Sequence, residues 1–280
     1  MAKKRIKQKD KKSNKKINKR INKKSETNSA YASMCAIAPV ITDKKIFEVI
    51  HQKVEIHQKK MEYKPTDKLI FIVLGIMSGC DVVFDLNRKL RVDRPLLKAF
   101  GYQKCADQSV IQDTHNAATQ ENVLQMEEAL KALWDENNLT VPLLENARIE
   151  GRIETIDIDL SGMPASKNAE CSTKGYFSEE RNIHGRQLAR IVFSKTQEII
   201  SESLYPGNKT SCKSFKSMVK KMENILQLND MSQRKLIRFR LDAGFGTDDN
   251  INYALCRGYH LLVKMYSGKR AKKLSNSVMG

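Results

Sequence analysis

The sequence has few of the features that mark secreted, membrane-spanning or zinc-binding proteins. Its longest apolar run, Leu69–Ile76, is far shorter than the ~20 residues that a helix needs to cross a bilayer. No apolar segment follows the charged N-terminus, so a secretory signal peptide is not expected. No C-x-x-C pair occurs, which argues against zinc, and the cysteines are expected as reduced thiols of a cytoplasmic protein. The six cysteines are Cys35, Cys80, Cys105, Cys171, Cys212 and Cys256.

Positive charge is plentiful and unevenly distributed. The formal net charge is +18, and residues 1–24 hold thirteen Lys and Arg against the single acid Asp10, a net +12. A basic arm of this kind favours nucleic acid, because each neutralised phosphate releases counterions. The alternative is a tail that only keeps the protein in solution. Residues 1–30 contain almost no apolar anchors, so we expect a disordered basic tail that is ordered only on binding.

Residues 31–145 predict an all-α domain for DNA binding or dimerisation. A helix begins at Thr42 or Asp43, and a second helix, Lys68–Met77, is apolar nearly all round. A longer helix, Gln120–Asn137, has its apolar residues at helical spacing. These residues are Val123, Met126, Leu130, Leu133 and Trp134.

Two short helices within this region are separated by a glycine turn. Pro95–Phe100 reads as the first helix, Gly101 as its end, and Asp107–Asn116 as the second helix with Asp107 as its cap. The pair resembles a helix-turn-helix, which would read DNA. The alternative is the ordinary packing of a small helical domain.

After Pro142 the pattern changes from helices to strands, and we expect a second domain over residues 146–280. Arg152–Ser161 alternates between apolar and polar residues, which puts Asp157 and Asp159 on one face, about 7 Å apart. Two neighbouring carboxylates are costly to bury unless a cation or hydrogen bonds offset them. This pattern indicates a metal site, and the alternative is an edge strand with one face in water.

The remaining pattern predicts the order β-β-β-α-β-α-β. A crossover helix returns the fourth strand parallel to an earlier one, and Asp242 follows that strand directly. If this strand lies beside the first, Asp242 comes near Asp159 at the carboxyl ends of the strands. The order matches an RNase H-like mixed α/β sheet. The expected elements are a polar connection (162–185), strands Gln187–Ser194 and Glu198–Leu204, helix Ser211–Leu228, strand Lys235–Leu241, a helix to about Arg257, and strand Tyr259–Met265.

Five short motifs occur in the order D-L-S-G, G-Y-F, H-G-R, Y-P-G-N and R-L-D-A-G-F. Together, within roughly residues 70–270, they resemble bacterial insertion-sequence transposases of the DDE type. The resemblance implies that Asp159, followed by Leu160-Ser161, and Asp242 are catalytic acids that bind Mg²⁺ or Mn²⁺, with Asp157 as the substitute for Asp159. It also implies cleavage of DNA phosphodiester bonds at transposon ends, followed by strand transfer.

The same resemblance implies partners and a location. They are double-stranded DNA (transposon ends and target), a homodimer on paired ends, and the bacterial cytoplasm. Four basic residues in or after the polar connection are expected to contact DNA phosphates, and the alternative for each is a solvated loop charge. These residues are Lys174, His184, Arg186 and Arg190.

The family has a third catalytic acid that this chain does not supply. That acid is a Glu on a C-terminal helix, but the last Glu here is Glu223, and Asp248 and Asp249 lie too close to the D-A-G-F turn. We therefore expect a C-terminally truncated transposase with little or no strand transfer on its own. The alternatives are a non-catalytic DNA-binding fragment that occupies transposon ends and inhibits the full enzyme, and a different RNase H-like nuclease.

Overall fold

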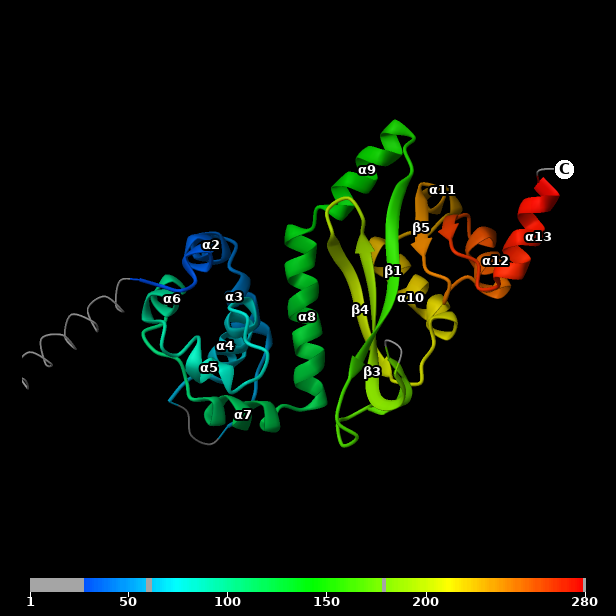
Figure 1. Ribbon diagram of the computed structural model, residues 1–280. Helices are drawn as coiled ribbons and strands as arrows, with labels where there is room; N and C mark the ends of the chain where they lie inside the picture. The colour runs from blue at the N-terminus through cyan, green and yellow to red at the C-terminus, as the bar shows by residue number, and fades with distance from the viewer. Residues whose placement is uncertain (1–27, 59–61, 178–179, 279–280) are drawn as a thin grey trace, which may run out of the picture. The chain divides into compact units, whose positions relative to one another are not determined.

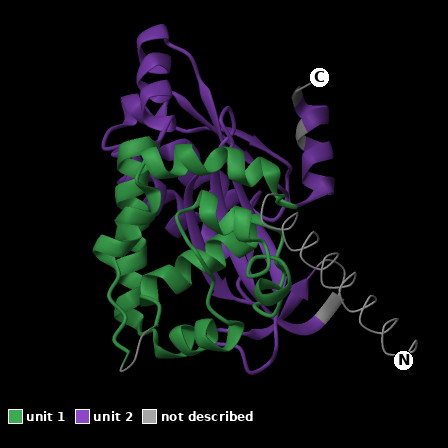
Figure 2. Ribbon diagram, turned by 90° about the vertical axis from the view of Figure 1, so that its left-hand side faces the viewer, with its two compact units in different colours: residues 1–137 green, residues 138–280 purple. Residues whose placement is uncertain are grey.

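The computed structural model describes residues 28–58, 62–177 and 180–278. The expected disordered tail therefore lies outside the described residues, except for its last three positions. The chain divides into two compact units, 1–137 and 138–280 (Figure 2). The boundary expected after residue 145 thus lies after Asn137.

The first unit is helical in its described part (Figure 1). Its helices enclose a buried apolar cluster that includes Phe71, Leu74, Leu97 and Ile111. The helices are α2 (Ala32–Asp43), α3 (Ile46–Lys53), α4 (Pro65–Met77), α5 (Asp85–Arg88), α6 (Arg94–Ala99), α7 (Gln108–Ala117) and α8 (Gln120–Asn137).

Helices α6 and α7 are the two short helices expected around Gly101. The Asp93 carboxylate accepts a hydrogen bond from the Leu96 amide at 3.0 Å, and the Asp107 carboxylate accepts one from the Ser109 amide at 3.0 Å. Each carboxylate satisfies an amide that has no partner within its own helix. The two helices and the Asp107 cap are confirmed, and DNA reading by this pair stays a prediction.

Three expectations for this unit need correction. Helix α2 was not expected, and the helix expected from Thr42 begins at Ile46 because Lys45, at φ 53°, interrupts the chain between the two helices. Helix α4 is apolar nearly all round, which suggested the centre of the helical core, but it is not buried all round, since Ile76 is 65% exposed. Helix α8 has the expected bounds, but Val123 and Leu130 on its expected apolar face are exposed.

The second unit is a mixed sheet with helices. Strand β3 pairs with β1 on one side and with β4 on the other, and β1 pairs with β5, which pairs with β6. The element order β-β-β-α-β-α-β expected from the sequence is present, with additional elements. The elements are α9 (Thr140–Glu150), β1 (Glu154–Pro164), β2 (Thr173–Phe177), β3 (Glu180–Phe193), β4 (Glu198–Pro206), α10 (Ser211–Leu226), α11 (Met231–Arg234), β5 (Ile237–Leu241), α12 (Asp248–Cys256), β6 (His260–Val263) and α13 (Gly268–Val278).

Helix α9 was missed because Pro142 suggested the end of helical structure. Pro142 lies in the first helical turn, where a missing N–H costs nothing. The Glu198 side chain on β4 accepts hydrogen bonds from the amides of Leu139 and Thr140 at 2.9–3.1 Å. The start of α9 is thus capped by a residue 58 positions further along the chain.

Residues 162–164, 173–177 and 180–185 belong to strands, so the expected polar connection is wrong there, and residues 165–172 form the loop between two of these strands. Strand β1 runs on to Pro164, β2 is added, and β3 begins at Glu180. The polar side chains of this segment lie largely on the exposed face of the sheet, and glycines occupy many of the positions on the opposite face. Because glycine is depleted in strands, this segment carries a weak strand signal.

Four glycines meet around the buried ring of Phe177, which is 2% exposed. A Cβ added at Gly162, Gly185 or Gly207 would lie 2.6–2.8 Å from that ring, and one at Gly175 would lie 2.1 Å from the Gly207 carbonyl oxygen. No side chain fits at these approaches. The motifs D-L-S-G, G-Y-F, H-G-R and Y-P-G-N therefore come together as one packing unit.

One face of the sheet is covered by apolar packing. Phe215 of α10 is fully buried and meets the ring of Phe239 on β5 at a centroid distance of 6.0 Å. Ile156 and Ile158 of β1 are buried, so their alternating neighbours point to the opposite face. That opposite face carries the acids expected to hold metal.

Candidate functional site

Asp159 and Asp242 lie at the same level of two neighbouring parallel strands. The last registered pair of β1 and β5 is Ile158 with Leu241, and each acid is the next residue. Neighbouring strands are about 4.8 Å apart, and registered residues of a sheet share a face. Both acids are exposed, so the fold brings together the two carboxylates that the sequence singled out.

Each carboxylate is held by one local hydrogen bond. The Ser161 hydroxyl donates to Asp159 Oδ2 at 2.9 Å, and the Gly244 amide donates to Asp242 Oδ1 at 2.9 Å. Within the described residues, no Lys, Arg or His forms an ion pair with either acid. The two carboxylates therefore lie on adjacent strands and pair with no cationic side chain in the described part of the chain.

Asp157 has a different environment from Asp159. Arg240, its registered partner on β5, donates from Nε and Nη2 to the two Asp157 carboxylate oxygens at 2.6 Å each. A bidentate pair of this kind neutralises the carboxylate and joins the strands. Arg240 accordingly has its pKa raised, first by the hydrogen bond to Asp157 and then by the charge of that acid.

The donor set of Asp159 and Asp242 fits a small hard cation only in part. Magnesium in proteins is commonly held by one or two carboxylates together with waters and substrate phosphates. In the described part of the chain, no cluster of three or more His, Cys, Asp or Glu is arranged to hold a metal ion. The pair could therefore supply two ligands, and the others would have to come from outside the described residues.

The turn that carries Asp242 is fixed by buried contacts. Asn250, 2% exposed, donates from Nδ2 to the Phe245 carbonyl at 3.1 Å and to the Cys212 carbonyl of α10 at 3.2 Å. A Cβ at Gly246 would lie 2.4 Å from the Lys264 carbonyl. The D-A-G-F-G sequence is thus required by a turn that packs against α10 and the chain after β6.

The four basic residues expected to contact DNA lie on two strands. Lys174 of β2 is registered with His184 of β3, and Arg186 and Arg190 follow His184 by two and six residues along β3. Arg190 is registered with Asp159, so alternation puts all four on the Asp159 face.

Two of these residues are already engaged. Arg190 forms an ion pair with Glu202, and Arg186 donates from Nε to the Glu170 carbonyl at 2.6 Å. His184 Nδ1 is buried and has no hydrogen-bond partner. These positions lie on strands and not in a loop, and neither their contact with DNA nor the alternative of a solvated charge is tested.

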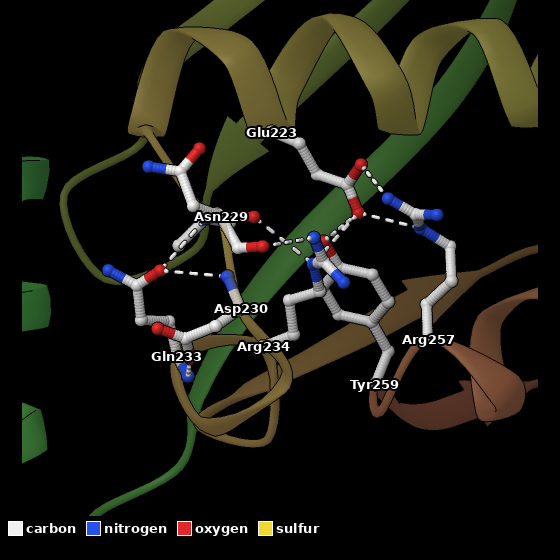
Figure 3. Close-up of polar contacts among 8 residues, drawn as sticks. Glu223, Asn229, Asp230, Gln233, Arg234, Arg257 and Tyr259 are labelled. Atoms are coloured by element: carbon white, nitrogen blue, oxygen red, sulfur yellow. Dashed lines mark hydrogen bonds and ion pairs between the residues drawn. The ribbon is translucent and has the colours of Figure 1, made fainter.

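Glu223, the last glutamate of the chain, is buried and lies in a network of ion pairs and hydrogen bonds (Figure 3). Its carboxylate accepts from Tyr259 Oη at 2.7 Å and from Arg257 Nε at 2.9 Å, and it pairs with Arg234 Nε at 3.3 Å. Burial and the hydrogen bond to Glu223 raise the pKa of Tyr259. The network joins α10 and α11 to residues 257–259, between α12 and β6, so Glu223 is a structural residue.

No family model and no curated protein matches the sequence. The solved structures that resemble the chain include two transposase complexes. A piggyBac transposase synaptic complex with hairpin DNA has a TM-score of 0.42 at 13% identity, over 80% of this chain and 49% of that one. A pre-cleavage Mos1 transpososome has a TM-score of 0.26 at 11% identity, over 74% of this chain and 62% of that one.

The chain spans about half the length of the piggyBac transposase chain. Because both TM-scores lie below 0.5, neither likeness assigns a function to this chain. None of the described helices is both long enough and apolar enough to cross a membrane.

Proposed function

We propose that this chain is a DNA transposase of the DDE type with an RNase H-like catalytic unit, residues 138–280. The register of β1 with β5 carries the proposal, because it sets Asp159 and Asp242 side by side on an exposed face. The order β4-β3-β1-β5-β6, with the last two strands parallel to β1, supports the RNase H-like assignment.

The residues of this chain have separate tasks in that function. Asp159 and Asp242 hold Mg²⁺ or Mn²⁺, which would stabilise the charge that develops on the oxygens of the reacting phosphate. Ser161 orients Asp159 through its hydrogen bond at 2.9 Å. Lys174 and Arg186, on the same face, bind the phosphate backbone of transposon-end or target DNA.

The chain supplies two acids where this class of enzyme uses three. A site with two carboxylates binds metal more weakly and positions it less well. We therefore propose that this chain by itself has little or no strand-transfer activity. Efficient joining of DNA ends by the purified 280-residue protein with Mg²⁺ would contradict this part of the proposal.

Iron-mediated cleavage of the polypeptide tests the metal site without requiring activity. Fe²⁺, used in place of Mg²⁺ with ascorbate and peroxide, should cut the chain near residues 159 and 242. Excess Mg²⁺ should suppress the cuts, and Asp159→Asn or Asp242→Asn should remove them. Asp157→Asn is the matched control, because Asp157 is already paired with Arg240, and it should leave the cuts in place. Cuts that persist in the Asp159→Asn, Asp242→Asn double variant would overturn the assignment.

The second candidate is a non-catalytic DNA-binding protein that occupies transposon ends and inhibits a complete enzyme. The lack of a third acid near the pair, within the described residues, favours it. This candidate predicts DNA binding that Asp159→Asn and Asp242→Asn leave unchanged, and no iron-mediated cut at either position.

A further inference from the structure

Lys264, the residue that follows β6, lies level with the two exposed acids. The last registered pair of the parallel strands β5 and β6 is Leu241 with Val263, and Asp242 and Lys264 are the next residues. The Lys264 amide donates to the Leu241 carbonyl at 3.4 Å, so the pairing continues past the end of β6. Because Asp159 is level with Asp242, the three residues form one row across three strands. Residues at one level of a sheet share a face, so Lys264 lies on the face of the acids.

The backbone at Lys264 is fixed by the turn that carries Asp242. A Cβ at Gly246 would lie 2.4 Å from the Lys264 carbonyl oxygen and 3.2 Å from Val263 Cγ2. The Tyr266 amide donates to the Gly246 carbonyl at 3.2 Å, directly after Lys264 and Met265. The same turn therefore holds both Asp242 and Lys264 in place.

The two cations at this level of the sheet differ in their partners. Arg190, registered with Asp159 on β3, pairs with Glu202 of β4. Lys264 is exposed, and its ammonium group forms no ion pair and no hydrogen bond with any side chain in the described part of the chain. The charge of Lys264 thus remains available to a ligand of the acid pair.

This free charge favours an anion above Asp159 and Asp242. A divalent cation would cancel the charges of the two carboxylates, and the ammonium group of Lys264 beside it would then be repelled. A phosphodiester group carries one negative charge, which would balance the lysine. Lysine binds phosphate as a compact charge on a flexible stem, so it can reach a ligand above the neighbouring strands.

We propose that Lys264 binds a non-bridging oxygen of the DNA phosphate that lies over Asp159 and Asp242. The ammonium group keeps its proton and stabilises the negative charge of that phosphate. Lys264 is then a catalytic residue in addition to the two acids. The inference rests on the proposed function, because it takes the acid pair as the metal site and DNA as the substrate.

Duplex binding by the full chain, measured with Mn²⁺ and again in EDTA, tests the proposal. With Mn²⁺, Lys264→Gln should bind a fluorescent DNA duplex about fivefold more weakly near physiological salt, the effect of losing one phosphate contact with a salt slope of about 0.9. In EDTA the loss should be less than about twofold, because two carboxylates without a metal ion repel the phosphate. An equal loss in both conditions would place the contact away from the acid pair and overturn the proposal.

Lys220→Gln is the matched control for this experiment. Lys220 is exposed on α10, which covers the opposite face of the sheet, and it forms no ion pair within the described residues. Its loss removes the same charge and should change duplex affinity less than about twofold in both conditions. A loss equal to that of Lys264→Gln would reduce the role of Lys264 to general attraction, against the proposal.

Mn²⁺ affinity separates a contact with the substrate from a structural role. Lys264→Gln should bind Mn²⁺ at least as tightly as the wild type, because it removes a like charge beside the metal ion. Weaker Mn²⁺ binding would show that Lys264 supports the site structurally, and it would overturn the proposed contact.

Acetylation of the wild-type chain, read by mass spectrometry, needs no variant to fold. Saturating duplex with Mn²⁺ should protect Lys264, and duplex in EDTA should leave it reactive, whereas Lys220 should be labelled in both conditions. Undiminished labelling of Lys264 in the Mn²⁺ complex would contradict its contact with DNA.

The two proposals can fail separately. Lys264 is not a metal ligand, so Lys264→Gln should keep the iron-mediated cuts near residues 159 and 242. Cuts that are kept together with unchanged duplex affinity would overturn only the role of Lys264. Absence of the cuts from the wild-type chain would overturn the metal site itself.

Discussion

Arg240 donates to both carboxylate oxygens of Asp157 at 2.6 Å, whereas Asp159, two residues further on the same face, pairs with no cation in the described part of the chain. The two acids look equivalent in the I-D-I-D repeat. Their neighbours on β5 separate them, because Arg240 is registered with Asp157 and Asp242 follows at the level of Asp159.

Exchange of each acid for its amide should therefore have different effects on metal binding. Asp157→Asn should change the Mn²⁺ affinity by less than threefold, and Asp159→Asn should weaken it at least tenfold because it removes one of two charged ligands. Electron paramagnetic resonance of free Mn²⁺ measures both. Equal weakening by the two variants would show that the site does not distinguish Asp159 from Asp157.

Gly185→Ala should destabilise the second unit by about 1–3 kcal/mol or more, the usual cost of overpacking. Its new Cβ would lie 2.5 Å from the Met163 carbonyl oxygen and 2.6 Å from the Phe177 ring. Gly268→Ala is the control, since nothing lies within 4 Å of its Cβ position. Urea unfolding followed by far-ultraviolet circular dichroism compares them, and equal midpoints would contradict the packing role of Gly185.

Glu223→Gln should destabilise the contacts that join α10, α11 and residues 257–259 by about 3–5 kcal/mol, because it leaves two arginines beside a buried, uncharged partner. Glu202→Gln removes an exposed partner of Arg190 and should cost only about 0–1 kcal/mol. Hydrogen exchange over residues 211–263 measures both. If Glu223→Gln and Glu202→Gln speed up the exchange equally, the structural role of the Glu223 network is contradicted.

Cys105 should resist alkylation in the folded protein, while the exposed Cys171 reacts. Burial raises the pKa of Cys105 to about 12 from 9.0, so at pH 8 only about one molecule in ten thousand holds the reactive thiolate. The unfolded thiol ionises first, so this group lowers stability as the pH rises above about 9. Mass spectrometry after iodoacetamide treatment, with a urea-unfolded control, tests this, and equal rates for both cysteines in the folded protein would refute it.

Local patterns predicted much of the second unit. The apolar spacing of Ser211–Leu228 corresponds to α10, and the alternation of apolar and polar residues in Arg152–Ser161 corresponds to β1. Helix α9 and strand β2 were missed because their determinants are distant: Glu198 caps α9, and glycines from four segments pack around Phe177, the last residue of β2.

The amino-acid sequence by itself determined the charge of the chain, most of the helix and strand segments, and the two acids worth pursuing. These features depend on residue type and on spacings of two to four residues, which act within one element. Only the tertiary structure decided which acid lies beside Asp242 and which side chains pair with Asp157 and Glu223. It also decided why the motif glycines are required. These outcomes depend on strand register and on contacts between segments tens of residues apart, which no local pattern specifies.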